Sequence, residues 1–303
     1  MAREYDEALR RFRETGPFYG VFGSGPGFAN HGPMVAEVLA WWGREGEIDG
    51  WVDAYSRLLK PRPLASAPID DWRHALGDWR RAGDWLAHFS DELARGSADA
   101  LVQEWLPRLL TGPDMLGHGS IRLFHVLRAL SRERTPEREA EVADALAYWA
   151  AAYDADFTVS RHGERTQGER WSPALDFDAL ILEGAWAYIS SPDVRPIVLT
   201  HAVTAPRAIR ELLPWLDSAG QQLALGVAAA LSEQIRTPYG APRPELPPGR
   251  PDRDELIERA VASGDDHAIK LTEACLDQFE RHPEPVYLAV ADDVTRRLRA
   301  EWL

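Results

Sequence analysis

The amino-acid sequence predicts an all-α protein, a single globular domain of about a dozen helices that spans residues 1–303. Almost every segment repeats its apolar residues with the period of a helix, and the alternation typical of strands is nearly absent. Short groups rich in Gly, Pro and Asp separate these segments. With 303 residues, 45% of them hydrophobic, the chain is long enough to bury a large core.

Seven helices are expected before residue 154. Breakers such as "TGP" at 15–17, "KPRP" at 60–63 and "TGPD" at 111–114 interrupt the apolar period between them. Trp79 and Trp85 share a helical stripe and are expected in the core. The expected helices are 3–14, 32–43, 46–59, 79–95, 98–110, 119–132 and 135–153.

Six more helices are expected in the second half of the chain. Prolines bound the stretch "SPDVRPIVLTHAVTAP" at 191–206, which predicts an irregular or short helical passage. Two long polar segments, 154–173 and 236–254, are typical of surface loops, and loops of this length are often lids or binding loops. No repeat of fixed period is present, which disfavours a solenoid. The expected helices are 177–190, 204–215, 217–235, 252–263, 266–281 and 284–301.

Charge and cysteine content narrow the class of protein. The net charge of −14 argues against nucleic acid and anionic membranes as partners. The charged N-terminus does not read as a signal peptide, and no apolar run approaches the roughly 20 residues of a membrane span. The single cysteine, Cys275, rules out an internal disulfide and favours a cytoplasmic setting. It is expected to be a small buried hydrophobic residue.

The common catalytic signatures are missing. "FGSGPGF" at 22–28 lacks the Lys-Ser/Thr of a P-loop and is interpreted as a flexible turn. No other dinucleotide fingerprint, G-x-S-x-G elbow or H-E-x-x-H motif occurs in the sequence. The 12 tryptophans indicate either rigid core layers or a pocket for a flat ligand.

The nine histidines fall into two groups. Four of them, at positions 74, 88, 162 and 282, lie in polar surroundings and are expected at the surface. The other five lie on apolar elements: His31, His118, His125, His201 and His267. One such histidine is more often a core residue with its hydrogen bonds satisfied. Histidines on four separate apolar elements are harder to explain in this way and leave a metal site open as an alternative, although dispersed ligands give no local signature. Imidazole suits Fe, Zn, Cu or Ni.

Lys270 stands out because only two of the 34 basic residues are lysines. It lies three residues after His267, on the same face of an expected helix whose first turn Asp265 or Asp266 can cap. The alternative is a lysine whose stem covers the core while its amine reaches water.

Five segments, in order, resemble the questin oxidase-like family. They are "NHGPMVAEVLAWWG", "WRHALGDWRRAGDWLAHFSDEL", "LGHGSIRLFHVLRAL", "LTHAVTAPRAIRELL" and "DDHAIKLTEA", and they run from about residue 18 to 285. The family includes fungal enzymes that open anthraquinone rings in aromatic polyketide pathways. One departure is Arg122, which stands where family members tend to have a second histidine, and His125 follows it.

The resemblance implies an all-helical oxygenase with a Baeyer–Villiger-like reaction on a planar polycyclic quinone or phenol. It also implies dioxygen as co-substrate, with NADPH or another external reductant involved. A mononuclear non-haem Fe(II) would be held by four histidines and a carboxylated lysine. Carried over by motif, these ligands are His31, His118, His201, His267 and Lys270.

Further roles stay open at the level of sequence. His125 or Arg122 would act as an acid–base or oxyanion partner. Asp265, Asp266 or Glu183 would orient the imidazoles, and Glu183 is equally well an ion-paired structural residue. Four aromatic residues would stack on the substrate or pack in the core: Trp41, Trp42, Phe124 and Trp186.

Two other functions fit the same residues. One is a metallohydrolase with zinc in the same ligand set, in which zinc-bound water is the nucleophile. The other is a non-enzymatic protein that binds an aromatic metabolite. The sequence makes no prediction about the oligomeric state.

Overall fold

The computed structural model describes residues 2–19, 28–159, 177–191, 196–239, 242–246, 249 and 251–300. Over these residues it contains fourteen α-helices and one small three-stranded sheet, so the all-α prediction is confirmed. The chain divides into two compact units, Met1–Ala155 with Glu301–Leu303 (unit 1) and Asp156–Ala300 (unit 2). Each unit is described separately, and the single domain over 1–303 stays a prediction.

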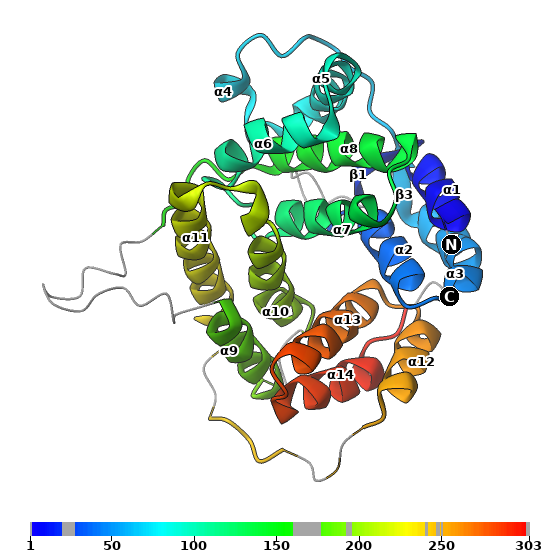
Figure 1. The fold of residues 1–303 in the computed structure, drawn as a ribbon, viewed down its shortest axis with the longest axis vertical. Helices are drawn as coiled ribbons and strands as arrows, with labels where there is room; N and C mark the ends of the chain where they lie inside the picture. Colours follow the sequence, from blue (N-terminus) through cyan, green and yellow to red (C-terminus); the bar gives the residue numbers. More distant parts are fainter. Residues whose placement is uncertain are drawn as a thin grey trace, which may run out of the picture. The chain divides into compact units, whose positions relative to one another are not determined.

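Unit 1 holds the first eight helices and the sheet (Figure 1). Two short 3₁₀ turns, η1 (Ser56–Leu58) and η2 (Trp79–Arg81), lie between them. The elements are α1 (Ala2–Phe12), β1 (Thr15–Tyr19), β2 (Phe28–Ala29), α2 (Gly32–Trp41), α3 (Glu45–Tyr55), β3 (Leu59–Pro61), α4 (Trp72–Ala75), α5 (Ala82–Arg95), α6 (Ala98–Leu109), α7 (His118–Arg132) and α8 (Pro136–Ala152).

Helix α8 is the centre of the unit 1 core. It begins after Thr135, whose hydroxyl accepts a hydrogen bond from the Arg138 amide, and α1, α5, α6 and α7 all pack on it. Trp149 on α8 is fully buried. A Cβ built at Gly119 of α7 would lie 2.4 Å from the Trp149 ring, so only glycine lets α7 approach this closely.

The sheet, which the sequence did not predict, positions the residues before α2. Its strands are antiparallel in the order β2-β1-β3 and too short for an alternating pattern. Asn30 Nδ2 donates to the carbonyl oxygen of Gly16 in β1 at 3.1 Å. The His31 amide donates to the Tyr55 hydroxyl at 2.8 Å. The sheet and α3 therefore fix His31 at the start of α2.

Unit 2 is built from six helices and one 3₁₀ turn, η3 (Leu213–Trp215). Helix α10 packs against α9, α11 and α13, and α14 packs against α9, α12 and α13 (Figure 1). The helices are α9 (Phe177–Ile189), α10 (Pro196–Glu211), α11 (Ser218–Arg236), α12 (Arg253–Ser263), α13 (Asp266–Arg281) and α14 (Pro285–Arg297).

Helix α10 corrects the prediction for 191–206 and for a helix over 204–215. It begins at Pro196 and runs through Pro206. Pro206 has no amide hydrogen for the carbonyl oxygen of Ala202. Gly184 of α9 approaches this carbonyl so closely that a Cβ there would lie 2.1 Å from the oxygen. Weak Cα–H···O contacts of this kind recur where helices pack closely.

Other expectations have mixed outcomes. Trp85 is fully buried as expected. Trp79 is 37% exposed, so the prediction that it lies in the core was wrong. Cys275 is buried as predicted. The segments 22–27 and 160–173 lie outside the described residues. Among the helices that the structure does describe, none combines the length and apolar character needed to cross a bilayer.

Candidate functional site

Unit 1 brings two of the predicted ligands together. His31 occupies the N-cap of α2 and His118 is the first residue of α7. Their rings stack, with centroids 4.9 Å apart and planes 19° from parallel, and both residues are buried. The start of each helix therefore brings one imidazole of the pair into the core of unit 1.

The two helices that carry this pair run parallel. After His31 and His118, the next contact joins Glu37 Oε2 to His125 Nδ1 at 2.8 Å. The Arg128 guanidinium then lies 4.3 Å from the centroid of the Trp41 ring. Because the contacts advance in the same direction on both helices, α2 and α7 begin at the same end, where the histidines lie.

Asp114, whose role was not predicted from the sequence, orients His118. The His118 ring donates from Nδ1 to Asp114 Oδ1 at 3.2 Å, and the Gly119 amide donates to Asp114 Oδ2 at 2.7 Å. Burial acts to raise the pKa of Asp114, but the hydrogen bond and charge of His118 outweigh it and hold the pKa below its usual value. The signal for this role is an Asp four residues before a histidine at a helix start.

Unit 2 brings a second pair together. His201 on α10 and His267 on α13 are both buried, with ring centroids 5.5 Å apart and an edge-to-face angle of 73°. His267 Nδ1 lies 3.1 Å from Asp266 Oδ1, and His201 Nδ1 lies 2.9 Å from the carbonyl oxygen of Ile197. Since both acceptors are oxygens, each ring carries its proton on Nδ1 and its lone pair on Nε2.

The helices of the second pair also run parallel. Beyond the histidines, Arg207 of α10 makes two 2.8 Å hydrogen bonds to Glu273 of α13, and both side chains are buried. Arg210 Nη1 then donates to Gln278 Oε1 at 2.9 Å. As in unit 1, the histidine pair lies at the shared N-terminal end and a buried ionic contact follows along the helices.

The two units share a short sequence pattern. His31 and Glu37 are six residues apart in "NHGPMVAE", and His267 and Glu273 have the same spacing in "DHAIKLTE". In each unit this glutamate contacts the helix that carries the other histidine. The roles of Glu37 and Glu273 were missed, because no repeat of fixed period connects the two segments. The shared His-x₅-Glu spacing is the signal that would have found them.

Lys270 lies one turn after His267 and is only 4% exposed, so the alternative of an amine in solvent is wrong. Burial lowers the pKa of the Lys270 amine to about 8, although the charges of Asp266 and Asp265 act in the opposite direction. Within the described part of the chain, no residue accepts a hydrogen bond from this amine. The corresponding position in unit 1 is Met34, so only α13 carries a lysine there.

His125 and Arg122, the predicted acid–base or oxyanion partners, are both buried on α7 and held by carboxylates. His125 is bound by Glu37, whose pKa is lowered because Arg128 and His125 outweigh the effect of burial. Arg122 binds Glu141 through Nε at 2.6 Å and through Nη2 at 3.0 Å. Its Nη1 is buried and has no hydrogen-bond partner among the residues that the structure describes.

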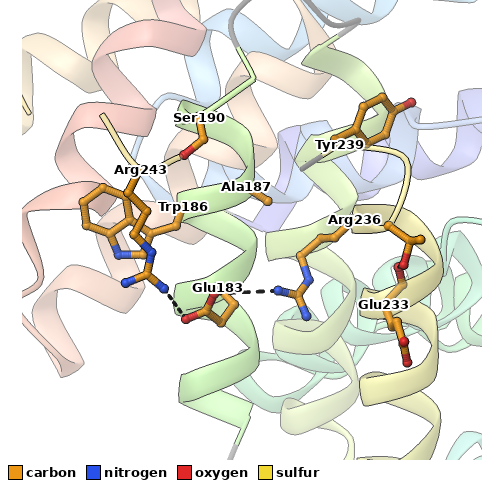
Figure 2. A pocket seen from close by; sticks show the side chains of 9 residues that line it. Glu183, Trp186, Ala187, Ser190, Glu233, Arg236, Tyr239 and Arg243 are labelled. Carbon is orange, nitrogen blue, oxygen red and sulfur yellow. Dashed lines mark hydrogen bonds and ion pairs between the residues drawn. The ribbon is translucent and has the colours of Figure 1, made fainter. Parts of the chain in front are cut away.

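Some of the remaining candidates contact the predicted ligands, and others have structural roles. Asp266 contacts the His267 ring, and Asp265 caps α13 by accepting from the amides of His267 and Ala268. Glu183 is 46% exposed and ion-paired with Arg243, as the structural alternative predicted (Figure 2). The face of Trp41 is covered by arginine guanidiniums. Trp186 lies beside Glu183 in a surface pocket of unit 2.

Three of the four histidines expected to be surface residues lie in the described part of the chain. His74 and His282 are exposed, with side-chain exposures of 89% and 55%. His88 is half-buried against Trp85 and Trp105, so its prediction was wrong. His162 lies outside the described residues.

Three of the predicted ligands have their rings fixed in the same way. Nδ1 of His118, His201 and His267 is hydrogen-bonded to a carboxylate or a backbone carbonyl, an arrangement that is common among histidines that bind metals. The predicted ligands are thus divided between the units, with His31 and His118 in unit 1 and His201, His267 and Lys270 in unit 2.

No protein-family model matches the chain, and no curated protein sequence matches it significantly.

Proposed function

We propose that the protein is a non-haem iron-dependent oxygenase. Its substrate would be a planar polycyclic quinone or phenol, with oxidative, Baeyer–Villiger-like cleavage of a ring or C–C bond. The observation that carries the proposal is the hydrogen bond that His118, His201 and His267 have in common, from Nδ1 to an oxygen. Proteins commonly prepare imidazole ligands in this way. The resemblance to the questin oxidase-like family supports the choice of reaction.

In this proposal five residues hold Fe(II). Bound iron would supply the one-electron chemistry by which an aromatic substrate reacts with dioxygen. The family resemblance assigns all five ligands to one ion. A cytoplasmic setting is part of the proposal. The ligands are His31, His118, His201, His267 and Lys270.

Lys270 would contribute as a carbamate. Its neutral amine attacks carbon dioxide, an N–C bond forms, and one proton is released to solvent. The product is an anionic oxygen donor, whereas the buried ammonium would repel a cation. Arginine cannot undergo this reaction because its guanidinium stays protonated. The burial of Lys270 beside His267 supports this role.

Arg122 and His125 would act on the substrate rather than on the metal. The buried Nη1 of Arg122 is a hydrogen-bond donor for a substrate oxygen that gains negative charge. Glu141 fixes the rest of the guanidinium and thereby its direction. The Glu37 carboxylate holds a proton on His125 Nδ1, so that Nε2 is the atom that would accept or return a substrate proton.

Oxygen uptake tests the proposed reaction. Protein loaded with Fe(II) is expected to consume dioxygen in the presence of 1,8-dihydroxyanthraquinone and NADPH, and the zinc-loaded protein is not. The Arg122→Gln variant should retain iron and lose about 10²–10³ in kcat, the usual cost of a lost oxyanion donor. Dioxygen uptake without a reductant would indicate a dioxygenase. Oxidation of one NADPH for each dioxygen consumed would indicate a monooxygenase.

Two results would replace the proposal. Turnover of the zinc form without dioxygen would identify a metallohydrolase. Tight binding of the anthraquinone that survives chelation, with no turnover in any metal form, would identify a binding protein.

A further inference from the structure

Unit 2 contains a second candidate site, a pocket of about 330 Å³ on its surface (Figure 2). Helix α9 supplies Glu183, Trp186 and Ser190, α11 ends in Arg236, and the segment after α11 supplies Tyr239 and Arg243. The volume lies at the small end of the range of about 300–1,000 Å³ found for ligand pockets. It suits a molecule of one or two rings.

The wall of the pocket combines an aromatic face with a cation. The Arg243 guanidinium lies over the Trp186 ring, 5.0 Å from its centroid. Guanidinium and indole are both flat, and each stacks well on a flat aromatic ligand. Because the Arg243 side chain is 52% exposed, it can move aside to admit a ring without disturbing the core.

Two guanidiniums in this pocket share one carboxylate. Glu183 contacts Arg243 directly, and its Oε2 lies 3.8 Å from Arg236 Nη1 (Figure 2). Each guanidinium can bind a carboxylate through two nitrogens, so a single shared carboxylate leaves donors available. Glu233 also lines the pocket, and its side chain is exposed. The remaining guanidinium donors of Arg236 and Arg243 can therefore bind an anion.

Ser190 provides independent evidence for a ligand. It lines the pocket, is only 8% exposed, and its Oγ has no hydrogen-bond partner among the described residues. A buried hydroxyl without a partner loses its hydrogen bonds to water and gains nothing in return. An oxygen or nitrogen on a bound molecule would supply the missing bond.

We propose that this pocket binds a small planar aromatic carboxylate. Its ring would stack on Trp186, its carboxylate would bind Arg236 and Arg243, and a polar ring substituent would bond to Ser190 Oγ. The site involves none of the predicted metal ligands and does not depend on the proposed oxygenase reaction.

Calorimetric titration with three probes tests the proposal. The wild-type protein is expected to bind 2-naphthoate at least tenfold more tightly than 2-naphthalenemethanol, which lacks the charge, and cyclohexanecarboxylate, which lacks the aromatic ring. Arg243→Gln and Trp186→Leu should each weaken 2-naphthoate binding about tenfold. Ser190→Ala should weaken binding of 6-hydroxy-2-naphthoate about fivefold and leave that of 2-naphthoate unchanged.

A matched control lies in unit 1. There the Arg73 guanidinium is 4.2 Å from the centroid of Trp72, in a pocket of about 360 Å³ whose Thr111 hydroxyl is bonded to Tyr153 and to the Arg108 carbonyl. Arg73→Gln is expected to leave 2-naphthoate binding unchanged. The proposal is overturned if 2-naphthoate does not bind at millimolar concentration, if the neutral probe binds equally well, or if Arg73→Gln weakens binding as much as Arg243→Gln.

Discussion

Replacing Glu273 with leucine is expected to lower the free energy of unfolding by about 3 kcal/mol, because Arg207 would remain buried without its main partner. Arg207 makes two hydrogen bonds to Glu273, and both side chains are almost completely buried. The loss is placed at the lower end of the range for broken buried pairs because Asp277 Oδ2, 3.1 Å from Arg207 Nε, still offers a contact. Urea unfolding measures the change.

A double variant distinguishes the effect of the unpaired charge on stability from the effect of the changed side-chain volume. Arg207→Met/Glu273→Leu replaces both charges with apolar side chains and is expected to stay within about 1 kcal/mol of the wild type. Glu104→Gln, which removes an exposed partner of Arg108, should change stability by less than about 1 kcal/mol. If the double variant is as unstable as the single one, the contact between α10 and α13 depends on the volume at these positions and not on the pair.

Replacing Lys270 with methionine is expected to stabilise the metal-free protein. The Lys270 amine has a pKa of about 8 in the folded protein, against 10.5 for an ordinary lysine. Folding therefore costs free energy whenever this amine must be protonated inside the core. The variant should gain on the order of 3 kcal/mol at pH 7, because each pH unit between the two values corresponds to about 1.4 kcal/mol.

The gain should depend on pH in a defined direction. Below pH 8 the amine is protonated in both states, and the full cost is present. Between pH 8 and 10.5 the unfolded chain binds more protons than the folded one, so wild-type stability rises with pH and the advantage of Lys270→Met shrinks. Above 10.5 the amine is neutral in both states and the advantage is gone.

Unfolding of both proteins in buffers free of metal and carbon dioxide measures this dependence. Lys60→Met, at the other lysine of the chain, which is exposed, is the control and should show no such pH dependence. A Lys270→Met variant that is less stable than the wild type at pH 7 would mean that the amine has a stabilising partner in the fold. That result would contradict the inference that burying this amine costs free energy.

Periodicity and breakers were sufficient to predict most of the helices. The predicted helix over 266–281, for instance, has the observed bounds, and of the two candidate caps, Asp265 and Asp266, Asp265 is the one that caps it. The local sequence pattern gave wrong helix bounds where contacts with distant parts of the chain stabilise a helix. Helix α10 continues through Pro206, and the Ala202 carbonyl that the proline leaves without a donor is covered by Gly184 of another helix, α9.

The candidate site shows the same limit. Sequence motifs singled out His31, His118, His201 and His267, but not that they form two pairs, because pairing depends on which helices run side by side. Parallel packing of α2 with α7 and of α10 with α13 creates each pair at a shared N-terminal end. Glu37 and Glu273 were overlooked because their partners are on other helices, and Asp114 because it lies in the loop before α7.

The iron content of anaerobically purified protein is the decisive measurement for the proposed iron site. If the five predicted ligands hold one ion, the wild type contains one Fe(II) per chain, and either His118→Ala or His267→Ala removes it. The exposed His74→Ala variant should keep its iron. Iron that remains in the His118→Ala or the His267→Ala variant, or two irons per chain, would contradict the assignment of all five ligands to one ion.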